Sequence, residues 1–303
     1  MTDLVVTAHD GIPLAVRDHG GDGPSIVLMH GAGMHLLSLE LLAAELADHR
    51  VVTMDARWCG WSGDSPAYDW ADLVRDVESV VDTLGLGNPV VAGHSWGGMI
   101  AAHYGVAHPD APAVINLDGH GAGNPSLYDG MTPDEIADAL AVLTELNRSM
   151  LTQETEGDDE WYAAAKAQSI ERYRAMRVPD DQVEAWAERT FARRDDGTWA
   201  LRPSPLLMQS LEGDLGLLVV YRAVRCPLLI FSCTKPQRFL PDQLNQMMAA
   251  YRRGLGRALD EIAAAHPNVE ISTHEDIDHN SIVGKHAPIV ADVMRRFVGR
   301  VSR

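Results

Sequence analysis

Short apolar segments alternate with helical patterns along the first part of the chain. Four continuous apolar segments occupy residues 25–31, 50–56, 89–95 and 113–119. Apolar segments of this length are typical of strands that are buried on both faces of a parallel sheet. The alternation predicts an α/β fold in which helices cover a largely parallel sheet through right-handed crossovers.

Amphipathic patterns between these segments predict the covering helices, at residues 37–49, 70–85 and 97–109. In the second of them the apolar residues fall on one helical face, and Gly85 follows as a stop signal. Residues 3–20, which precede the first apolar segment, have the pattern of an antiparallel hairpin.

The strand pattern is interrupted after residue 124. A capping box at Thr132–Glu135 starts a helical region, and two further helices are predicted at 158–176 and 179–191. A small hairpin at Asp196-Gly197 is an alternative for residues 193–201. The strand pattern returns later, and a helix closes the chain. We therefore predict a core of residues 1–124 and 223–303, with two late strands at 226–235 and 268–276, and an all-helical cap of residues 125–222.

The segment Gly93-His94-Ser95-Trp96-Gly97 carries the first candidate chemistry. It matches G-x-S-x-G and lies between a predicted strand and a predicted helix, which is the context that a nucleophile elbow requires. A sharp turn here would expose the Ser95 hydroxyl and direct the first N–H groups of the helix toward the same point. Glycines on both sides remove the Cβ atoms that would collide across such a turn.

Four motifs in this order resemble the α/β-hydrolase superfamily: LMHGAG at 28–33, MDARWCGWSGDS at 54–65, AGHSWGGMIA at 92–101 and EDIDHNSIV at 275–283. The resemblance covers essentially the whole chain. It implies a mostly parallel, doubly wound sheet, with the helical cap as the variable part. It also implies that Ser95 is the nucleophile and that the backbone N–H groups of Ala32 and Trp96 form an oxyanion hole.

The resemblance further implies that His279 is the catalytic base. A serine hydroxyl needs such a base near neutral pH, and histidine is suited to it. The chain has 13 histidines. His30 and His94 lie within motifs and are interpreted as structural, whereas His286, at the start of the last helix, remains an alternative to His279.

The acid of the triad is where this chain departs from the family pattern. The usual position, after the strand at 226–235, is occupied by Pro236. Some members of the superfamily place the acid one strand earlier, and that position is Asp118. The alternatives are Asp242, which has the pattern of a first-turn helix residue, and the pair Asp276 and Asp278.

Aromatic residues are the candidates for substrate contacts. Trp58 replaces a small residue in the loop of the second motif and is a candidate for the pocket wall. Trp161, Tyr162 and Trp186 lie on predicted cap helices, where aromatic side chains form either the core of the cap or part of the pocket.

Composition narrows the class of ligand. The chain has 25 Lys and Arg against 43 Asp and Glu, a net charge of −18, which disfavours nucleic acid and, more weakly, strongly anionic substrates. No metal-ligand spacing or phosphate loop is present, so no cofactor is expected. Without a long apolar segment or a secretory leader pattern, we expect a soluble, cytoplasmic protein with no membrane partner and with three reduced cysteines.

Together these features predict a serine hydrolase that cleaves an ester or lactone bond of a sizeable apolar small molecule. Within the enzyme class, the alternatives are a hydrolase of C–C bonds and a non-hydrolytic lyase or cyclase on the same scaffold. A small-molecule receptor is the alternative from a different class, since the usual acid position is lost. The oligomeric state is not encoded in any recognisable pattern.

Overall fold

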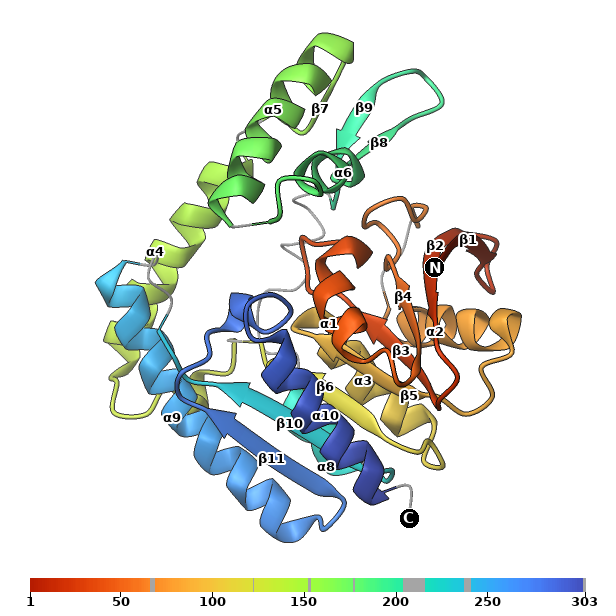
Figure 1. Ribbon diagram of the computed structural model, residues 1–303. Helices are drawn as coiled ribbons and strands as arrows, with labels where there is room; N and C mark the ends of the chain where they lie inside the picture. Colours follow the sequence, from red (N-terminus) through yellow and green to blue (C-terminus); the bar gives the residue numbers. More distant parts are fainter. Residues whose placement is uncertain are drawn as a thin grey trace.

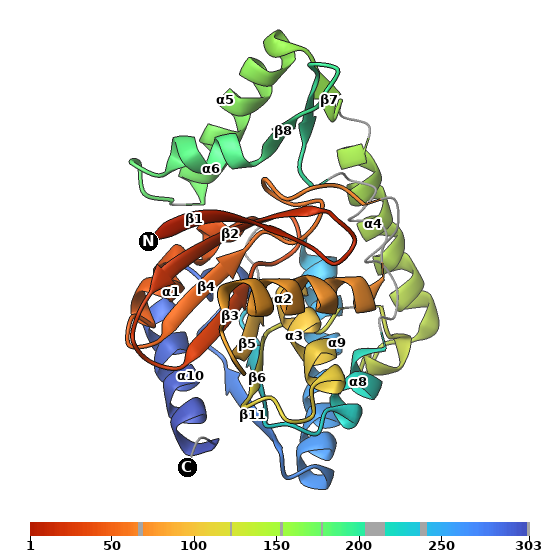
Figure 2. The same ribbon diagram turned by 90° about the vertical axis from the view of Figure 1, so that its right-hand side faces the viewer.

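The computed structural model describes residues 1–65, 69–121, 123–151, 154–176, 178–203, 216–236 and 241–301 (Figure 1). A central sheet is covered by helices on both faces, and a second group of elements lies beyond one end of that sheet (Figure 2). Among the described helices, none combines the length and the apolar composition needed to cross a bilayer.

The central sheet has eight strands in the order β1-β2-β4-β3-β5-β6-β10-β11. Strands β1 and β2 form an antiparallel hairpin, β2 also pairs antiparallel with β4, and all other neighbours are parallel. The bounds are β1 (Thr2–Thr7), β2 (Pro13–Gly20), β3 (Ser25–Met29), β4 (Arg50–Met54), β5 (Val90–His94), β6 (Val114–Leu117), β10 (Leu228–Cys233) and β11 (Val269–His274). The α/β fold and the strands predicted from the hydrophobic pattern are thus confirmed.

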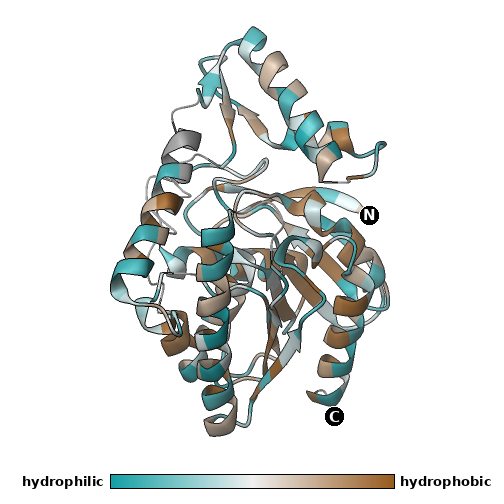
Figure 3. Cartoon of the chain, turned by 90° about the vertical axis from the view of Figure 1, so that its left-hand side faces the viewer, coloured by the Kyte–Doolittle hydropathy of each residue, from teal (hydrophilic) through white to brown (hydrophobic). Residues whose placement is uncertain are grey.

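Both faces of the sheet are apolar because helices cover both. In β3, Val27 packs in the core that is shared with one set of helices, whereas its neighbour Leu28 packs in the core on the opposite face. The first set comprises α2 (Trp70–Leu84), α3 (Trp96–Ala107), α8 (Leu217–Ala223) and α9 (Asp242–Ala265), and the second comprises α1 (Glu40–Glu45) and α10 (Ala287–Val301). Figure 3 shows hydrophobic residues concentrated on the central strands between these layers.

The segment predicted as an all-helical cap also contains strands, so that prediction is wrong. It contains η2 (Pro125–Leu127), α4 (Pro133–Leu151), α5 (Asp159–Ala175) and α6 (Val183–Arg189), but also a small antiparallel sheet of β7 (Glu156–Gly157), β8 (Phe191–Arg193) and β9 (Trp199–Leu201). The hairpin of β8 and β9 turns at Asp196-Gly197, where Gly197 has a φ of 87°. Strands of two or three residues are too short to produce a visible period-two pattern.

The end of the predicted cap also differs. Helix α8, which begins at Leu217, packs against α3 in the layer that covers the central sheet. Leu217 and Tyr221 belong to the same hydrophobic core as Val114 of β6. Residues 217–222 therefore contribute to the core, because their apolar face is buried against the sheet layer.

Helices α5 and α6 dock on the core through apolar contacts and two arginines. Tyr173, Val183 and Trp186 pack against Leu36 and Leu37 of η1 (Leu36–Leu39). Beside this cluster, the Arg189 Nε donates a hydrogen bond of 2.8 Å to Asp55, and the Arg202 Nε donates one of 2.8 Å to the carbonyl of Trp58. The contacts join this part of the chain to the loop that follows β4.

Candidate active site

Ser95 lies on the sharp turn between β5 and α3. Its φ is 53° and its ψ is −118°, values that L-residues rarely adopt. A Cβ on Gly93 would lie 2.2 Å from the backbone carbon of Gly97, and one on Gly97 would lie 2.5 Å from the carbonyl oxygen of Met29. The two glycines are thus required by close backbone approach, as expected for this turn from the sequence.

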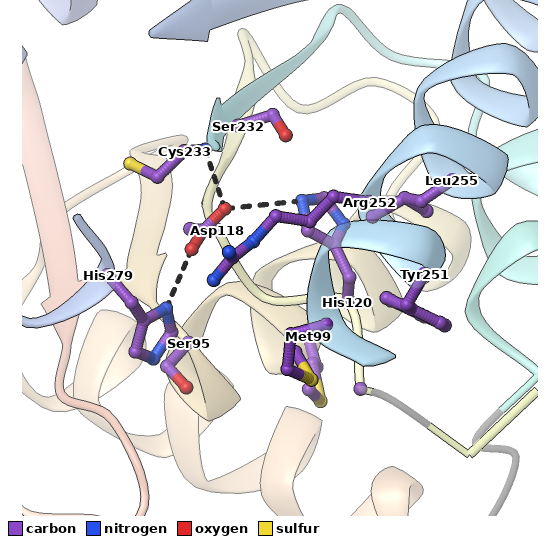
Figure 4. A pocket seen from close by; sticks show the side chains of 12 residues that line it. Ser95, Met99, Asp118, His120, Ser232, Cys233, Tyr251, Arg252, Leu255 and His279 are labelled. Atoms are coloured by element: carbon purple, nitrogen blue, oxygen red, sulfur yellow. Dashed lines mark hydrogen bonds and ion pairs between the residues drawn. The ribbon is translucent and has the colours of Figure 1, made fainter. Parts of the chain in front are cut away.

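His279 begins η3 (His279–Ser281), directly after the loop that follows β11. Its Nδ1 lies 2.7 Å from the Asp118 Oδ2, which is the hydrogen bond predicted from the sequence. Ser95, Asp118 and His279 line the same pocket, where Figure 4 shows their side chains. The pocket lies at the carboxyl ends of the parallel strands, where ligands bind in open α/β sheets.

Asp118 is held by a turn with an unusual backbone. It follows β6 with a φ of 59°, and its second oxygen, Oδ1, accepts a hydrogen bond of 2.8 Å from the backbone N–H of Cys233. The buried Asn116 side chain stabilises the turn: its Oδ1 accepts from the Gly119 N–H at 2.7 Å, and its Nδ2 donates to the Gly119 carbonyl and to the Tyr221 hydroxyl, both at 2.8 Å.

Asp118 remains ionised in this environment. Burial alone would raise its pKa, but the hydrogen bond from His279, the charges of His279 and His120, and the Cys233 N–H together hold the pKa below its usual value. An ionised carboxylate accepts the Nδ1–H of His279, which leaves the Nε2 as the basic atom.

His30 and His94 have structural positions. The His30 Nδ1 lies 2.8 Å from the Gly31 carbonyl, while its Nε2 accepts the Ala56 N–H at 3.1 Å. Burial lowers the pKa of His94 to about 3, so its neutral ring donates from Nε2 to the carbonyl of His279 at 2.9 Å. His94 thereby fixes the backbone of the candidate base.

The predicted oxyanion donors lie on two adjoining segments. Trp96 is the first residue of α3, and Ala32 lies in the loop after β3. The N–H of Gly97 donates a hydrogen bond of 3.1 Å to the carbonyl of His30, which ties the helix N-terminus to that loop. Their role in stabilising an oxyanion remains a prediction.

The pocket beside Ser95 has a volume of about 250 Å³. Apolar side chains of Met99, Met248 and Leu255 line it together with His120 and Arg252. This volume is below the roughly 300–1,000 Å³ of a typical small-molecule pocket, and the described lining mixes apolar and polar side chains.

Sequence reasoning missed His120 and Arg252 in this lining. His120 follows Asp118 so closely that its place after β6 is a usable signal, and its Nε2 lies 3.7 Å from the Asp118 Oδ1. Arg252 lies in the third turn of a long helix, far in sequence from any motif.

The aromatic residues predicted to contact substrate lie elsewhere in the described structure. Trp161 and Tyr162 pack edge-on against Phe191, and Tyr162 also stacks on Trp199 with 3.9 Å between the ring centroids. Trp186 packs against Tyr173 in the cluster under η1. These three side chains pack within the cap and its contact with the core.

Trp58 is likewise absent from the described lining of the pocket at Ser95. It has a φ of 65°, and its indole N–H donates to the Ser65 carbonyl at 2.8 Å. The neighbouring Arg57 is fully buried and pairs with Asp76 and Asp10. This loop is fixed by its own contacts, and Trp58 forms part of that loop instead of the described pocket wall.

The alternative acids and base are placed away from the triad geometry. Asp242 is exposed at the first position of α9, and Asp276 is exposed in the loop after β11. Asp278 lies at the N-cap of η3, and the Nδ1 of His286 lies 2.7 Å from the Ser281 hydroxyl. Of the four, none lines the described pocket at Ser95.

One group of candidate metal ligands occurs in the described part of the chain: His9, Asp10 and Asp76, with ligand atoms within 4.8 Å of one another. Asp10 and Asp76 already form ion pairs with the Arg57 guanidinium. Since this cation engages both carboxylates, the group is explained as part of a structural ion-pair network.

The sequence matches the model of the alpha/beta hydrolase family over residues 26–283. The chain belongs to this family. The match spans the candidate nucleophile, acid and base, and the hydrolase fold accounts for the arrangement of strands around them.

Individual relatives have varied activities. The chain is 26% identical over 208 residues, 64% of its length, to the 2-hydroxy-6-oxononadienedioate/2-hydroxy-6-oxononatrienedioate hydrolase of Cupriavidus pinatubonensis. It is 37% identical over 108 residues, 33% of its length, to epoxide hydrolase B of Mycobacterium tuberculosis. The matches cover 66% and 30% of those two proteins, respectively. The crystal structure of the enol-lactonase from Burkholderia xenovorans LB400 is similar in fold, with a TM-score of 0.61 and 20% identity over 98% of this chain and 100% of that one.

Proposed function

We propose that this protein is a serine hydrolase that cleaves a carboxylic ester or lactone of a small molecule. The observation that carries the proposal is the 2.7 Å hydrogen bond between Asp118 and His279 in the pocket that contains Ser95 on its strained turn. A largely buried carboxylate, an imidazole and a partly exposed hydroxyl are the three groups that a catalytic triad requires.

In the proposed reaction the Ser95 Oγ bonds to the carbonyl carbon of the substrate while its proton passes to the His279 Nε2. The tetrahedral oxyanion is stabilised by the N–H groups of Ala32 and Trp96. The C–O bond to the leaving group then breaks, and His279 returns the proton to the leaving oxygen. Water hydrolyses the acyl-enzyme with the same base, which restores Ser95 and releases the acid.

A second candidate is the hydrolysis of a C–C bond next to a carbonyl group. The similarity to the Cupriavidus hydrolase, whose name describes an oxo-dienedioate substrate, favours it. The two reactions share the nucleophile and base but differ in the leaving atom, which is oxygen in one and carbon in the other. Mass analysis of products from aryl esters, lactones and vinylogous diketo acids therefore separates them.

Labelling by a fluorophosphonate probe tests the nucleophile. We expect wild-type protein to be labelled, Ser95→Ala to be unlabelled, and His279→Ala to react much more slowly because the base is lost. Ser95→Ala should lower kcat for any hydrolysed ester by about three orders of magnitude or more without unfolding the protein. Ser232→Ala is the matched control, since Ser232 lines the same pocket. Absence of labelling in wild type, or labelling that is unaffected in His279→Ala, would refute the proposal and leave the receptor alternative, whereas labelling that persists in Ser95→Ala would refute Ser95 as the nucleophile.

A further inference from the structure

A cationic side chain faces the candidate nucleophile across the pocket. Arg252, on α9, lines the same pocket as Ser95 and His279 and is only partly exposed to solvent. Figure 4 shows its side chain extending from the helix toward Asp118 and Ser95. A group bound there would lie between the guanidinium and the reacting atoms.

Within the described residues, Arg252 has no hydrogen bond or ion pair, unlike the arginines that follow it on the same helix. Arg253 and Arg257 both pair with the exposed Asp129. The only carboxylate in the described lining of the pocket is Asp118, whose two oxygens are already engaged by His279 and by the Cys233 N–H. Among the residues that the structure describes, none thus provides Arg252 with a counter-ion that is free to bind it.

A partly buried cation without a fixed partner is suited to bind an anionic ligand. Arg252 is only partly exposed and lines the pocket together with the apolar side chains of Met99, Met248 and Leu255. A partly desolvated cation loses hydration free energy that an anion in the same pocket restores, and a carboxylate fits the guanidinium with two parallel hydrogen bonds.

We propose that Arg252 binds a free carboxylate of the substrate, so that the preferred substrates are esters or lactones that carry a second, unreacted carboxylate. This inference rests on the proposed hydrolase function and names its substrate class. The net charge of −18 acts on distant anions and is screened by salt, whereas Arg252 acts at contact inside the pocket. The local cation therefore determines the preference once the substrate is bound.

Matched ester pairs test the proposal. The substrates are the 4-nitrophenyl hemiesters of succinic, glutaric and adipic acid and the corresponding neutral methyl esters, so that the carboxylate is the only difference within a pair. We expect wild type to prefer the acid for at least one chain length. Arg252→Gln should reduce kcat/KM for that acid by about tenfold to a hundredfold, and reduce the acid-to-methyl-ester ratio by the same factor. Arg252→Lys should restore part of the ratio, since a charge returns without the planar fork.

Arg253→Gln is the matched control, because it removes an arginine from the same helix at an exposed position. We expect it to keep the wild-type ratio. Equal losses for acid and methyl ester in Arg252→Gln, or an unchanged ratio, would overturn the inference, because the residue would then act on the pocket as a whole or not at all.

Binding to the inactive Ser95→Ala variant separates this inference from the proposed function. Calorimetric titration with the same hemiesters should show binding that weakens by about tenfold or more in Ser95→Ala/Arg252→Gln. If wild type is not labelled by the fluorophosphonate but this difference persists, the hydrolase proposal fails and the carboxylate site remains. If labelling succeeds and the hemiesters bind equally to both variants or to neither, the carboxylate site is rejected.

Discussion

Ser95 and Asp118 both have positive φ, a backbone conformation that costs about 1–3 kcal/mol for a residue with a Cβ. Each strained residue is the first one after a parallel strand, so each side chain is turned toward the sheet edge instead of continuing the strand direction. Strain of this kind persists only when surrounding contacts fix the backbone. Here the glycines around Ser95 and the Asn116 side chain beside Asp118 supply those contacts.

Asp118→Asn should greatly reduce hydrolysis while preserving the fold. The amide keeps the size of the side chain but no longer stabilises the imidazolium, and it favours the wrong tautomer of His279. We expect kcat to fall by about four orders of magnitude, measured with the best ester substrate. Asp242→Asn is the control, because that carboxylate is exposed at the start of α9. Near-normal activity in Asp118→Asn combined with an inactive Asp242→Asn would assign the acid to the later loop.

The resemblance to the α/β-hydrolase pattern allowed the three triad candidates to be named, since each follows a recognisable strand. Ser95 lies in a motif, Asp118 ends an apolar segment, and His279 lies after the last strand. Arg252 has no such signal, since its position depends on how α9 packs over the pocket. The cap aromatics were equally ambiguous from the sequence, because the same side chains serve a cap core and a ligand wall.

At the scale of elements, the turn after β6 depends on a side chain from within the strand and another from α8. Asn116 bonds to both backbone groups of Gly119, and Tyr221 contacts the Gly119 carbonyl at 2.7 Å and the His120 Nδ1 at 3.1 Å. This small network aims Asp118 at His279. It also explains why α8 belongs to the core layer, where the sequence had placed it in the cap.

Asn116→Ala should therefore lower both stability and turnover. Removing the amide leaves the buried Gly119 N–H and carbonyl without this partner, which costs about 1–3 kcal/mol in the free energy of unfolding. Because Asn116 only positions Asp118, we expect kcat to fall more than KM changes. Tyr221→Phe, which deletes a single hydroxyl, is the graded control and should have a smaller effect on both quantities. Chemical denaturation measures the stability of each variant, and steady-state kinetics measures its kcat and KM. Loss of stability with unchanged kcat would contradict the positioning role.

The central strands were predictable because each is long, apolar and bounded by turns. Of the three strands beside α5, only the hairpin of β8 and β9 had a sequence signal, at Asp196-Gly197, since segments of two or three residues have no measurable period. Helix α9 was predicted only at its start, although Leu244, Met247, Tyr251 and Leu255 have the helical spacing that defines its buried face. Docking of the cap through Arg189 and Asp55 joins residues 134 positions apart, and no local pattern encodes such a pairing.

At the scale of the whole molecule, the docking of the cap buries an ionisable group. His35, at the start of η1, is 2% exposed, and its ring lies 5.2 Å from that of Trp186 and 6.1 Å from that of Tyr173. Burial, partly opposed by Asp55, lowers the pKa of His35 from 6.5 to about 3. The interface between cap and core therefore requires a neutral imidazole.

This requirement predicts that acid destabilises the docked molecule through His35. Above about pH 6.5 the imidazole is neutral in the folded and the unfolded protein, so the full stability is present. As the pH falls below that value, the unfolded chain binds a proton, whereas the folded protein excludes it until about pH 3. His35 should then reduce the free energy of unfolding by up to about 1.4 kcal/mol per pH unit in this window. Urea denaturation between about pH 7 and pH 4.5 should show a shallower decline of the free energy of unfolding with falling pH in His35→Gln than in wild type.

Trp186→Phe is the control, because it alters the same interface without a titrating group. It should be less stable at every pH but keep the wild-type dependence of stability on pH. Parallel curves for wild type and His35→Gln would show that the ring is protonated or released at the interface, and that the cap does not hold it neutral.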